Sequence, residues 1–464
     1  MNGSPEVVVV GAGISGLATA WELLQRGRRP LVIERSKRAG GVIFTERVDD
    51  FLVDAGPDAL LVQKPAALQL CRELGLGDRL HPTLTPRTAF VLRRGRLIPL
   101  PEPSVLGIPT GLGPFVRTPL FSWRGKARMA LELALPAREA QGDESIGSFI
   151  GRRFGEEALT YLADPLLAGI HAGDVQRLSM RSAFPLLLQA EHTHGSVLRG
   201  LRAQKSKRAA SGNDSHGAFM SLPGGIGELV AALVDRMPAG ALRYGSGVVS
   251  ISGRGPYVVT LDTGEPLSAP VVIVATPAWT ASSILSILDE PLASLIGKIP
   301  YVSSATVAIG ARRDQVAHPL NGSGFVVPRP ERRLLMAGSW VSSKWPHRAP
   351  EGFVLLRGFV GGAYDPDALA RSDAELGAAV FDEFRALLDI SGPPLFTRVY
   401  RWPRANAQHE VGHLERMAEI DRLLDGHPGI YVTGSGFRGT GIPDCVADGR
   451  ATAARADAFL QSRT

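Results

Sequence analysis

Three glycines near the N-terminus have the spacing that lets a protein backbone approach a phosphate. Gly11, Gly13 and Gly16 follow the β-branched run VVVV and form the pattern G-x-G-x-x-G. In this pattern the first glycine permits a tight turn, the second lets the backbone approach a pyrophosphate, and the third lets a helix pack closely on a strand. The following helix would offer free N–H groups and the positive end of its dipole to the phosphates. The sequence therefore predicts a dinucleotide-binding turn at residues 11–16.

An acidic residue at a suitable distance narrows the choice of dinucleotide. Glu34 lies eighteen residues beyond Gly16 and directly follows a second short strand, which we expect at residues 30–33. This is close to the spacing at which an acid binds a ribose hydroxyl, whereas a 2′-phosphate would call for a basic residue. FAD or NAD is therefore expected rather than NADP. The order of strand, glycine turn, helix, strand and acid predicts a Rossmann-like βαβ unit.

Two further segments close to this unit favour a large, flat cofactor. The pattern R-x-G-G-x-x-x-T runs from Arg38 to Thr45, and the turn D-A-G-P begins at Asp54. A pair of glycines lets a loop press against a flat or phosphorylated ligand, and Arg38 could add positive charge to that contact. Each segment alone reads as a turn, but both lie within a short distance of the nucleotide motif.

A second helix N-terminus near the cofactor is predicted at the C-terminal end of the chain. Gly434, Gly436, Gly439 and Gly441 form a loop, and Pro443 then occupies a favoured position in the first turn of a helix. Such an N-terminus stabilises negative charge on the pyrimidine side of a reduced flavin. Because NAD needs no second site of this kind, the loop favours FAD.

Composition excludes several other classes of protein. The chain has 464 residues, of which 44% are apolar, and its net charge of +6 is too dilute to suggest nucleic-acid binding. Cys71 and Cys445 are its only cysteines, so neither a disulfide framework nor a metal site is expected. No run of about 18 apolar residues is present, and the glycine motif leaves no room for a signal peptide. We expect a soluble or peripheral protein of two or three domains.

The middle of the chain is predicted to contain a helical insertion. Residues 101–123 are rich in proline and glycine yet strongly apolar, and a basic helical stretch follows them. An apolar loop before a basic amphipathic helix is typical of a protein that lies on a membrane, and an ordinary inserted helix is an equal alternative. Residues 145–192 read as helical. The polar, basic residues 202–217 predict a flexible loop at a domain boundary.

Together these motifs resemble the flavin amine oxidase superfamily, which includes the protoporphyrinogen oxidases. The resemblance to protoporphyrinogen oxidases rests on GIHAGDVQRLSMRSAFP (169–185), LPGGIGEL (222–229), FVGG (359–362) and GTGIPDC (439–445). Two features differ from the amine oxidases. Residues 299–310 contain no lysine where those enzymes place one near the flavin, and residues 434–445 contain a single aromatic residue, Phe437.

The resemblance implies an α/β protein with α+β insertions and three parts. A discontinuous Rossmann-like FAD domain would comprise residues 1–86, 218–280 and 398–464. A helical membrane-binding insertion would span residues 87–217, and a sheet-containing substrate-binding domain would span residues 281–397. Membrane contact would involve the 101–123 segment through Phe115, Leu120 and Phe121. By the same resemblance the protein would be peripheral on the cytoplasmic side of a membrane, and a homodimer is possible.

The resemblance also implies a set of site residues. The expected FAD contacts are Gly11, Ala12, Gly13, Ile14, Ser15, Gly16, Glu34, Arg35, Gly40, Gly41, Gly56, Pro57, Asp58, Ala59, Leu60, Val248, Trp402, Gly439, Thr440, Gly441, Ile442 and Asp444. Gly169, Val326 and Phe359 are the expected catalytic residues and would line the porphyrinogen pocket. The arginine that holds a substrate propionate in some relatives would be one of Arg93, Arg94 and Arg96.

The activity implied by the resemblance is the oxidation of protoporphyrinogen IX to protoporphyrin IX. Three two-electron steps through FAD would consume O2 and form H2O2. Coproporphyrinogen III, which carries four propionates, is the alternative substrate and would call for a more basic pocket and less membrane contact. A carotenoid desaturase or an amine oxidase is a further alternative. A catalytically inactive FAD-stabilised scaffold is the alternative from a different class.

Overall fold

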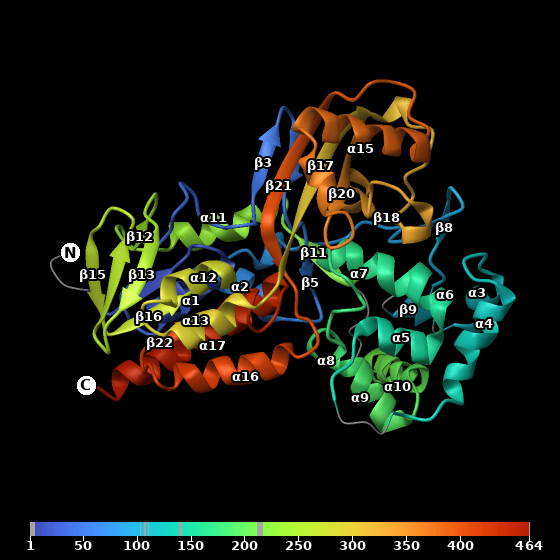
Figure 1. Ribbon diagram of the computed structural model, residues 1–464. Coiled ribbons are helices and arrows are strands. Elements are labelled where there is room, and N and C mark those ends of the chain that lie inside the picture. Colours follow the sequence, from blue (N-terminus) through green and yellow to red (C-terminus); the bar gives the residue numbers. More distant parts are fainter. Residues whose placement is uncertain are drawn as a thin grey trace.

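A five-stranded parallel sheet lies in the part of the molecule that is predicted to bind the dinucleotide (Figure 1). The computed structural model describes residues 5–102, 104–105, 108–109, 111–138, 142–210 and 217–463. The strands of this sheet, in spatial order, are β12 (Leu242–Arg243), β2 (Pro30–Ile33), β1 (Val7–Val10), β16 (Val271–Val274) and β22 (Ile430–Val432). Every residue of β1 and β16 is buried, as expected for a parallel sheet covered on both faces. The α/β fold class and the assembly of this sheet from distant segments are confirmed.

Alternate residues of β1 face two different layers, because successive side chains of a strand point to opposite sides. Val7 and Val9 belong to a core with α1 (Ile14–Gln25), α2 (Ala66–Glu73), α11 (Gly227–Asp235) and α17 (Ile442–Gln461). Val8 and Val10 belong to a second core. It contains α12 (Ala278–Leu285), α13 (Glu290–Gly297), α16 (His413–Leu424) and the antiparallel strands β13 (Val248–Ser252), β14 (Tyr257–Leu261) and β15 (Pro266–Ala269).

A seven-stranded mixed sheet forms the second large part. Its order is β21 (Phe396–Ala407), β17 (Tyr301–Arg312), β20 (Phe353–Gly361), β19 (Ala337–Trp340), β18 (Gly324–Val326), β7 (Ala89–Arg93) and β8 (Arg96–Pro99). Helix α15 (Asp373–Leu388) packs Val380 and Phe384 on one face. Smaller elements connect this sheet to the nucleotide domain: α14 (Val341–Lys344), the hairpin of β3 (Thr45–Val48) and β4 (Phe51–Asp54), and the sheet of β5 (Leu60–Leu61), β11 (Phe219–Ser221) and β6 (His81–Pro82).

Sheet membership differs from two of the expected domain boundaries. Strands β7 and β8 lie inside the range expected for the helical insertion, and most of β21 lies inside the last FAD segment, yet all three belong to the seven-stranded sheet. The reason is that β21 pairs with β17, β7 pairs with β18 and β8 pairs with β7, which satisfies their backbone hydrogen bonds. We therefore propose a substrate domain that includes residues 89–99 and 396–407.

The third part is a helical insertion with its own core. Its elements are β9 (Ser104–Val105), β10 (Ile108–Pro109), α3 (Leu112–Arg117), α4 (Trp123–Ala130), α5 (Ile146–Phe154), α6 (Glu156–Ala158), a π-helical turn (Leu159–Ala163), α7 (Asp164–His171), α8 (Met180–Ala183), α9 (Pro185–His194) and α10 (Val197–Ala210). The prediction that residues 202–217 are a loop is wrong for 202–210, which continue α10, and residues 211–216 lie outside the described residues.

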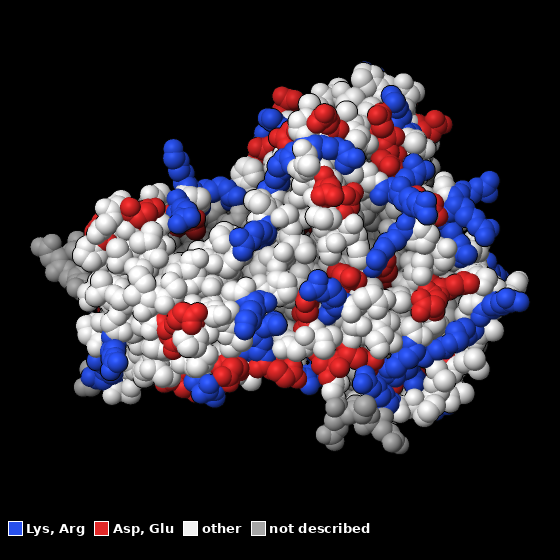
Figure 2. Space-filling model, in the orientation of Figure 1, with Lys and Arg blue, Asp and Glu red and all other residues white. Residues whose placement is uncertain are grey.

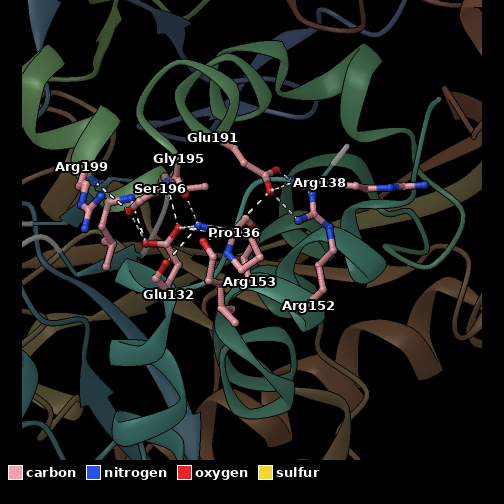
Figure 3. A network of polar contacts seen from close by, with 12 residues as sticks. Glu132, Pro136, Arg138, Arg152, Arg153, Glu191, Gly195, Ser196 and Arg199 are labelled. Carbon is pink, nitrogen blue, oxygen red and sulfur yellow. Dashed lines mark hydrogen bonds and ion pairs between the residues drawn. The ribbon is translucent and has the colours of Figure 1, made fainter. Parts of the chain in front are cut away.

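A buried ion network holds the helices of this insertion together (Figure 3). The Arg153 guanidinium pairs with the Glu132 carboxylate, and both side chains are almost completely buried. Glu132 also accepts hydrogen bonds from the Ser196 hydroxyl at 2.6 Å and from the backbone N–H of Val197 at 2.7 Å. The carboxylate therefore fixes the start of α10.

The expected membrane contact through residues 101–123 is wrong for two of its three named side chains. Leu120 and Phe121 are buried in the core of the insertion, and Phe115 is half-buried against that core. Burial of these side chains stabilises the insertion itself, so they are not available to a lipid surface. Residues 103, 106, 107 and 110 of the segment lie outside the described residues. Within the described part of the chain, no helix has both the length and the apolar character needed to cross a bilayer.

Candidate active site

The three glycines of the N-terminal motif have different structural roles. Gly11 has φ +105°, and a Cβ there would lie 2.9 Å from the carbonyl oxygen of Ala275. A Cβ at Gly16 would overlap the carbonyl oxygen of Gly11, so Gly16 is required by the packing of α1 against the end of β1, whereas Gly11 is required by the close approach of the segment that follows β16. At Gly13, the residue before α1, no atom of the described residues, apart from Gly13 and its two chain neighbours, lies within 4 Å of a Cβ position. The Gly13 position therefore opens into space beside the α1 N-terminus, where a phosphate fits.

Glu34 lies directly beside this turn. Its two carboxylate oxygens accept hydrogen bonds from the backbone N–H of Ala12 and of Ser36, each at 2.8 Å. These bonds fix the orientation of the carboxylate, and each oxygen keeps further acceptor capacity for a ribose hydroxyl. Arg35 is exposed and lies near Gly247.

Val248 is brought to the same end of the site. The N–H groups of Gly245 and Ser246 donate to the carbonyls of Ser36 and Glu34 at 3.0 and 3.1 Å. These bonds tie the start of β13 to the end of β2, so Val248, which is buried, lies at the Glu34 end of the site.

The second glycine pair packs against the first turn. The N–H of Gly40 donates to the carbonyl of Ala12 at 2.8 Å, and a Cβ at Gly41 would lie 3.5 Å from the Cα of Gly13. The guanidinium of Arg38 donates to the Gly41 carbonyl at 2.7 Å and lies 4.6 Å from the centre of the Phe44 ring. Arg38 thus fixes its own loop, and its contribution of positive charge toward the ligand stays a prediction.

The D-A-G turn after β4 is held by side chains from three strands of the seven-stranded sheet. Thr306 Oγ1 and Trp402 Nε1 donate to the carbonyl of Ala55 at 2.6 and 3.2 Å. Arg357 donates to the carbonyls on either side, those of Asp54 and Gly56. The turn continues into Pro57, Asp58, Ala59 and Leu60. Trp402 is thus placed against the turn itself. Thr306 and Arg357 could not be found from the sequence, because their strands are distant from the turn along the chain.

The C-terminal loop places a second helix N-terminus at the same edge of the sheet. Helix α17 begins at Ile442 after Gly439, Thr440 and Gly441, and Asp444 Oδ2 accepts from the N–H of Gly441 at 3.3 Å. Strands β1 and β22 both run parallel to β16, so the helices that follow them start at the same edge.

Helices α1 and α17 pack closely because Gly449 has no side chain. A Cβ at Gly449 would lie 2.6 Å from the carbonyl oxygen of Ser15, and the Thr19 hydroxyl donates to the carbonyls of both residues, at 2.8 Å to Ser15 and 3.1 Å to Gly449. Two helix N-termini therefore converge on one site, as an extended phosphate-containing cofactor requires.

Two charged or titratable side chains missed in the sequence lie at this end. The Lys64 ammonium forms an ion pair of 2.7 Å with Asp444. Burial, and then the nearby Lys64, lowers the pKa of His171 to about 4, so this imidazole is neutral at pH 7.

The three residues expected to line the substrate pocket are brought together. A Cβ at Gly169 would lie 3.4 Å from the Cβ of Ala337 and 3.7 Å from Cγ1 of Val326. Ala337 pairs with Val326 on one side and with Phe359 on the other. Because cross-strand partners share one face of a sheet, these side chains and the bare backbone of Gly169 form one apolar surface. Ile170 beside it is 64% exposed.

One of the three candidate arginines points toward this surface. Arg93 and Val91 are two residues apart on β7, so their side chains lie on the same face of the strand, and Val91 pairs with Val326. Its guanidinium lies 4.3 Å from the centre of the Tyr161 ring, and its Nη1 is buried without a hydrogen-bond partner among the described residues. Arg94 lies in the hairpin turn with φ +52°, and Arg96 is exposed. Arg93 is therefore the one with a buried, unpaired donor.

Comparisons with known proteins agree with this geometry. The family model of flavin-containing amine oxidoreductases matches residues 14–457. A coproporphyrinogen III oxidase of Bacillus subtilis (strain 168) is 37% identical over 99% of this chain and 100% of its own length. The chloroplastic protoporphyrinogen oxidase of Nicotiana tabacum is 29% identical over 98% of this chain and 86% of its own.

A solved structure shows the same fold over the whole chain. It is a protein of Exiguobacterium sp. 255-15, provisionally assigned as a protoporphyrinogen oxidase, and it matches with a TM-score of 0.86 at 29% identity, covering 98% of this chain and 99% of that one. The chain is therefore a flavin-containing amine oxidoreductase of the porphyrinogen oxidase group, an oxidase that uses FAD.

Proposed function

We propose that this enzyme oxidises coproporphyrinogen III to coproporphyrin III. One substrate and three O2 would give one porphyrin and three H2O2, so six electrons and six protons leave the macrocycle. The observation that carries the choice of substrate is the similarity to coproporphyrinogen III oxidases of three organisms at 30 to 37% identity over at least 96% of the chain.

The sequence had favoured protoporphyrinogen IX because of the apolar 101–123 segment. That argument loses its support, since Leu120 and Phe121 are core residues. A buried, unpaired arginine donor at the pocket also suits a substrate with more carboxylates. Protoporphyrinogen IX remains the second candidate, because it is the substrate in the name of the tobacco relative.

The chain's own residues are expected to bind and orient the substrate. FAD, when bound, supplies the acceptor for a hydride from a meso carbon. Gly169 lets the macrocycle approach closely, Val326 and Phe359 exclude water from its faces, and the Nη1 of Arg93 would bind one propionate. Burial lowers the pKa of His171 to about 4, so we expect its neutral imidazole to offer a propionate a hydrogen bond but no positive charge.

The decisive experiment is the ratio of kcat/KM for the two porphyrinogens, measured by porphyrin fluorescence and oxygen uptake with purified protein. A ratio above about 10 in favour of coproporphyrinogen III, which is about 1.4 kcal/mol, supports the proposal. A ratio in the opposite direction assigns the second candidate. Absence of oxygen uptake with either substrate refutes porphyrinogen oxidation.

Replacement of Arg93 tests the propionate contact. Arg93→Leu is expected to raise the KM for coproporphyrinogen III about 10-fold or more, because a charge-assisted hydrogen bond contributes about 1.5 to 3 kcal/mol. Arg96→Leu, in the same hairpin but exposed, is the matched control and should leave KM unchanged. Equal KM values for the two variants would contradict the assignment.

We also propose a revised surface for peripheral membrane contact. Val116, Trp123 and Leu131 are 47%, 72% and 55% exposed, and Arg124 beside them is exposed as well. Figure 2 shows a band of Lys and Arg side chains over the helical insertion at the lower right. Exposed apolar side chains on a helical insertion that also carries exposed basic side chains suit an anionic bilayer. Flotation with anionic liposomes should therefore be lost in a Trp123→Ser, Leu131→Ser variant and retained in Ile287→Ser, which removes an equally exposed side chain elsewhere.

A further inference from the structure

We propose that Arg357 is a positioning residue that couples the FAD-binding turn to the porphyrinogen pocket. The inference rests on the proposed function, since it takes the flavin to lie at residues 56–60 of the turn that begins at Asp54, and the porphyrinogen to lie at Phe359. Arg357 belongs to β20 and is 4% exposed.

The guanidinium of Arg357 binds three alternate residues of one turn. Its Nη1 donates to the carbonyl oxygens of Asp54 at 2.7 Å and Gly56 at 2.8 Å, and its Nη2 lies 3.2 Å from Oδ2 of Asp58. A planar guanidinium presents its N–H groups in a fixed fork, so these contacts define the position of the turn and not only its charge balance.

The same side chain is in contact with the substrate side. Arg357 and Phe359 are two residues apart on β20, so their side chains lie on the same face of the strand. The guanidinium carbon lies 4.8 Å from the centre of the Phe359 ring. Phe359 pairs with Ala337, which borders Gly169 in the pocket. One residue thus touches the backbone of the turn and an aromatic wall of the pocket.

The role of Arg357 is more than to balance the negative charge of Asp58. Lys344 Nζ lies 3.0 Å and Trp345 Nε1 3.1 Å from Asp58 Oδ2. Burial by itself would raise the pKa of Asp58, but Lys344 and Arg357 together hold it well below its usual range. Because Asp58 has these other partners, the contacts specific to Arg357 are the two carbonyls and the Phe359 ring.

A second buried arginine in the same network provides a matched control. Arg348 is fully buried, lies 3.0 Å from Asp54 Oδ2, and donates to the carbonyls of Leu222 and Pro223. It binds the side chain of the first residue of the turn and touches no pocket residue in the contacts of the described chain. Substitution at Arg348 therefore reports the cost of disturbing a buried cation without disturbing Phe359.

The experiment compares wild-type protein with Arg357→Lys and Arg348→Lys, which both retain the charge. The FAD Kd is measured by flavin fluorescence, the apo thermal midpoint by circular dichroism, and KM at saturating FAD with coproporphyrinogen III. Arg357→Lys is expected to raise the FAD Kd and the porphyrinogen KM about 10-fold each, the equivalent of one hydrogen bond. Arg348→Lys is expected to lower the thermal midpoint with both constants near the wild-type values.

A double-mutant cycle with Phe359→Leu identifies the coupling. Phe359→Leu should weaken FAD binding in the wild-type background but not in the Arg357→Lys background, because the link is already broken. Additive effects, or an Arg357→Lys variant that behaves like Arg348→Lys, would overturn the proposal. This FAD measurement needs no substrate, so it remains decisive even if wild-type protein oxidises no porphyrinogen and the proposed function fails.

Discussion

Replacing Gly13 by valine is expected to abolish FAD binding while leaving the apo fold intact. Gly13 has φ −68° and ψ 174°, a conformation that valine adopts without strain. Apart from its chain neighbours, no described residue has an atom within 4 Å of the position that the Cβ would occupy. The added side chain would instead fill the space between the α1 N-terminus and the pyrophosphate.

The size of the effect follows from the bonds that would be lost. A valine side chain would hold a phosphate away from the first N–H groups of α1. Each charge-assisted hydrogen bond contributes about 1.5 to 3 kcal/mol. Loss of two such bonds costs at least about 3 kcal/mol, which is about a 100-fold or greater rise in the FAD Kd. The apo-protein, which meets no clash, should change in stability by no more than about 0.5 kcal/mol.

Gly16→Ala is the matched control within the same motif. Its Cβ would overlap the carbonyl oxygen of Gly11, so α1 must move away from β1 and the apo thermal midpoint should fall. The assays are the flavin absorbance of the purified protein, an FAD titration and thermal unfolding of the apo form. A yellow Gly13→Val protein with native FAD affinity would refute the placement of the pyrophosphate at this turn.

Three other perturbations test separate parts of the structure. Glu132→Ala removes the main carboxylate partner of the buried Arg153, which keeps only Glu191 at 3.5 Å, and should lower the free energy of unfolding by about 3 kcal/mol, measured by chemical denaturation; an unchanged midpoint would contradict the network. Burial, and then the stacked ring of His413, lowers the pKa of His409 to about 3. An unfolded histidine titrates near 6.5, so below that pH the unfolded chain binds a proton that the folded chain does not. The stability that comes from burying neutral His409 is therefore complete above about pH 6.5 and is lost as the pH falls toward 3. His409→Gln should make the free energy of unfolding less dependent on pH between these values. Gly169→Val should raise the porphyrinogen KM with unchanged FAD content, since its Cβ would already contact Val326, and an unchanged KM would exclude Gly169 from the pocket.

The nucleotide-binding unit could be predicted in detail because its function depends on backbone conformation. Gly11 requires a positive φ and Gly16 a close approach, so the residue types themselves report the geometry. The same holds for Gly441 and Asp444, which mark the start of α17. Motifs of this kind are local, and neighbouring residues in the chain are also neighbours in space.

Which residues are buried, and which polar segments are helical, could not be predicted from the sequence with the same success. Leu120 and Phe121 have the composition of a membrane-contacting segment, but they are buried against the helices of the insertion. Residues 202–210 have the polar composition of a loop, but Glu132 stabilises the N-terminus of α10, to which they belong. In both cases tertiary contacts outweigh local composition.

The sequence by itself determined the dinucleotide turn, the preference for FAD and the porphyrinogen oxidase resemblance, because these depend on short-range patterns of glycine, proline and acid. Only the tertiary structure decided which residues act together across the parts of the molecule. Arg357 binds the backbone of Asp54, which lies 303 residues earlier in the chain. Arg93 differs from its neighbouring arginines by its buried Nη1 and its position beside Tyr161. Such contacts arise from strand pairing between distant segments, and single-residue types carry no signal for them.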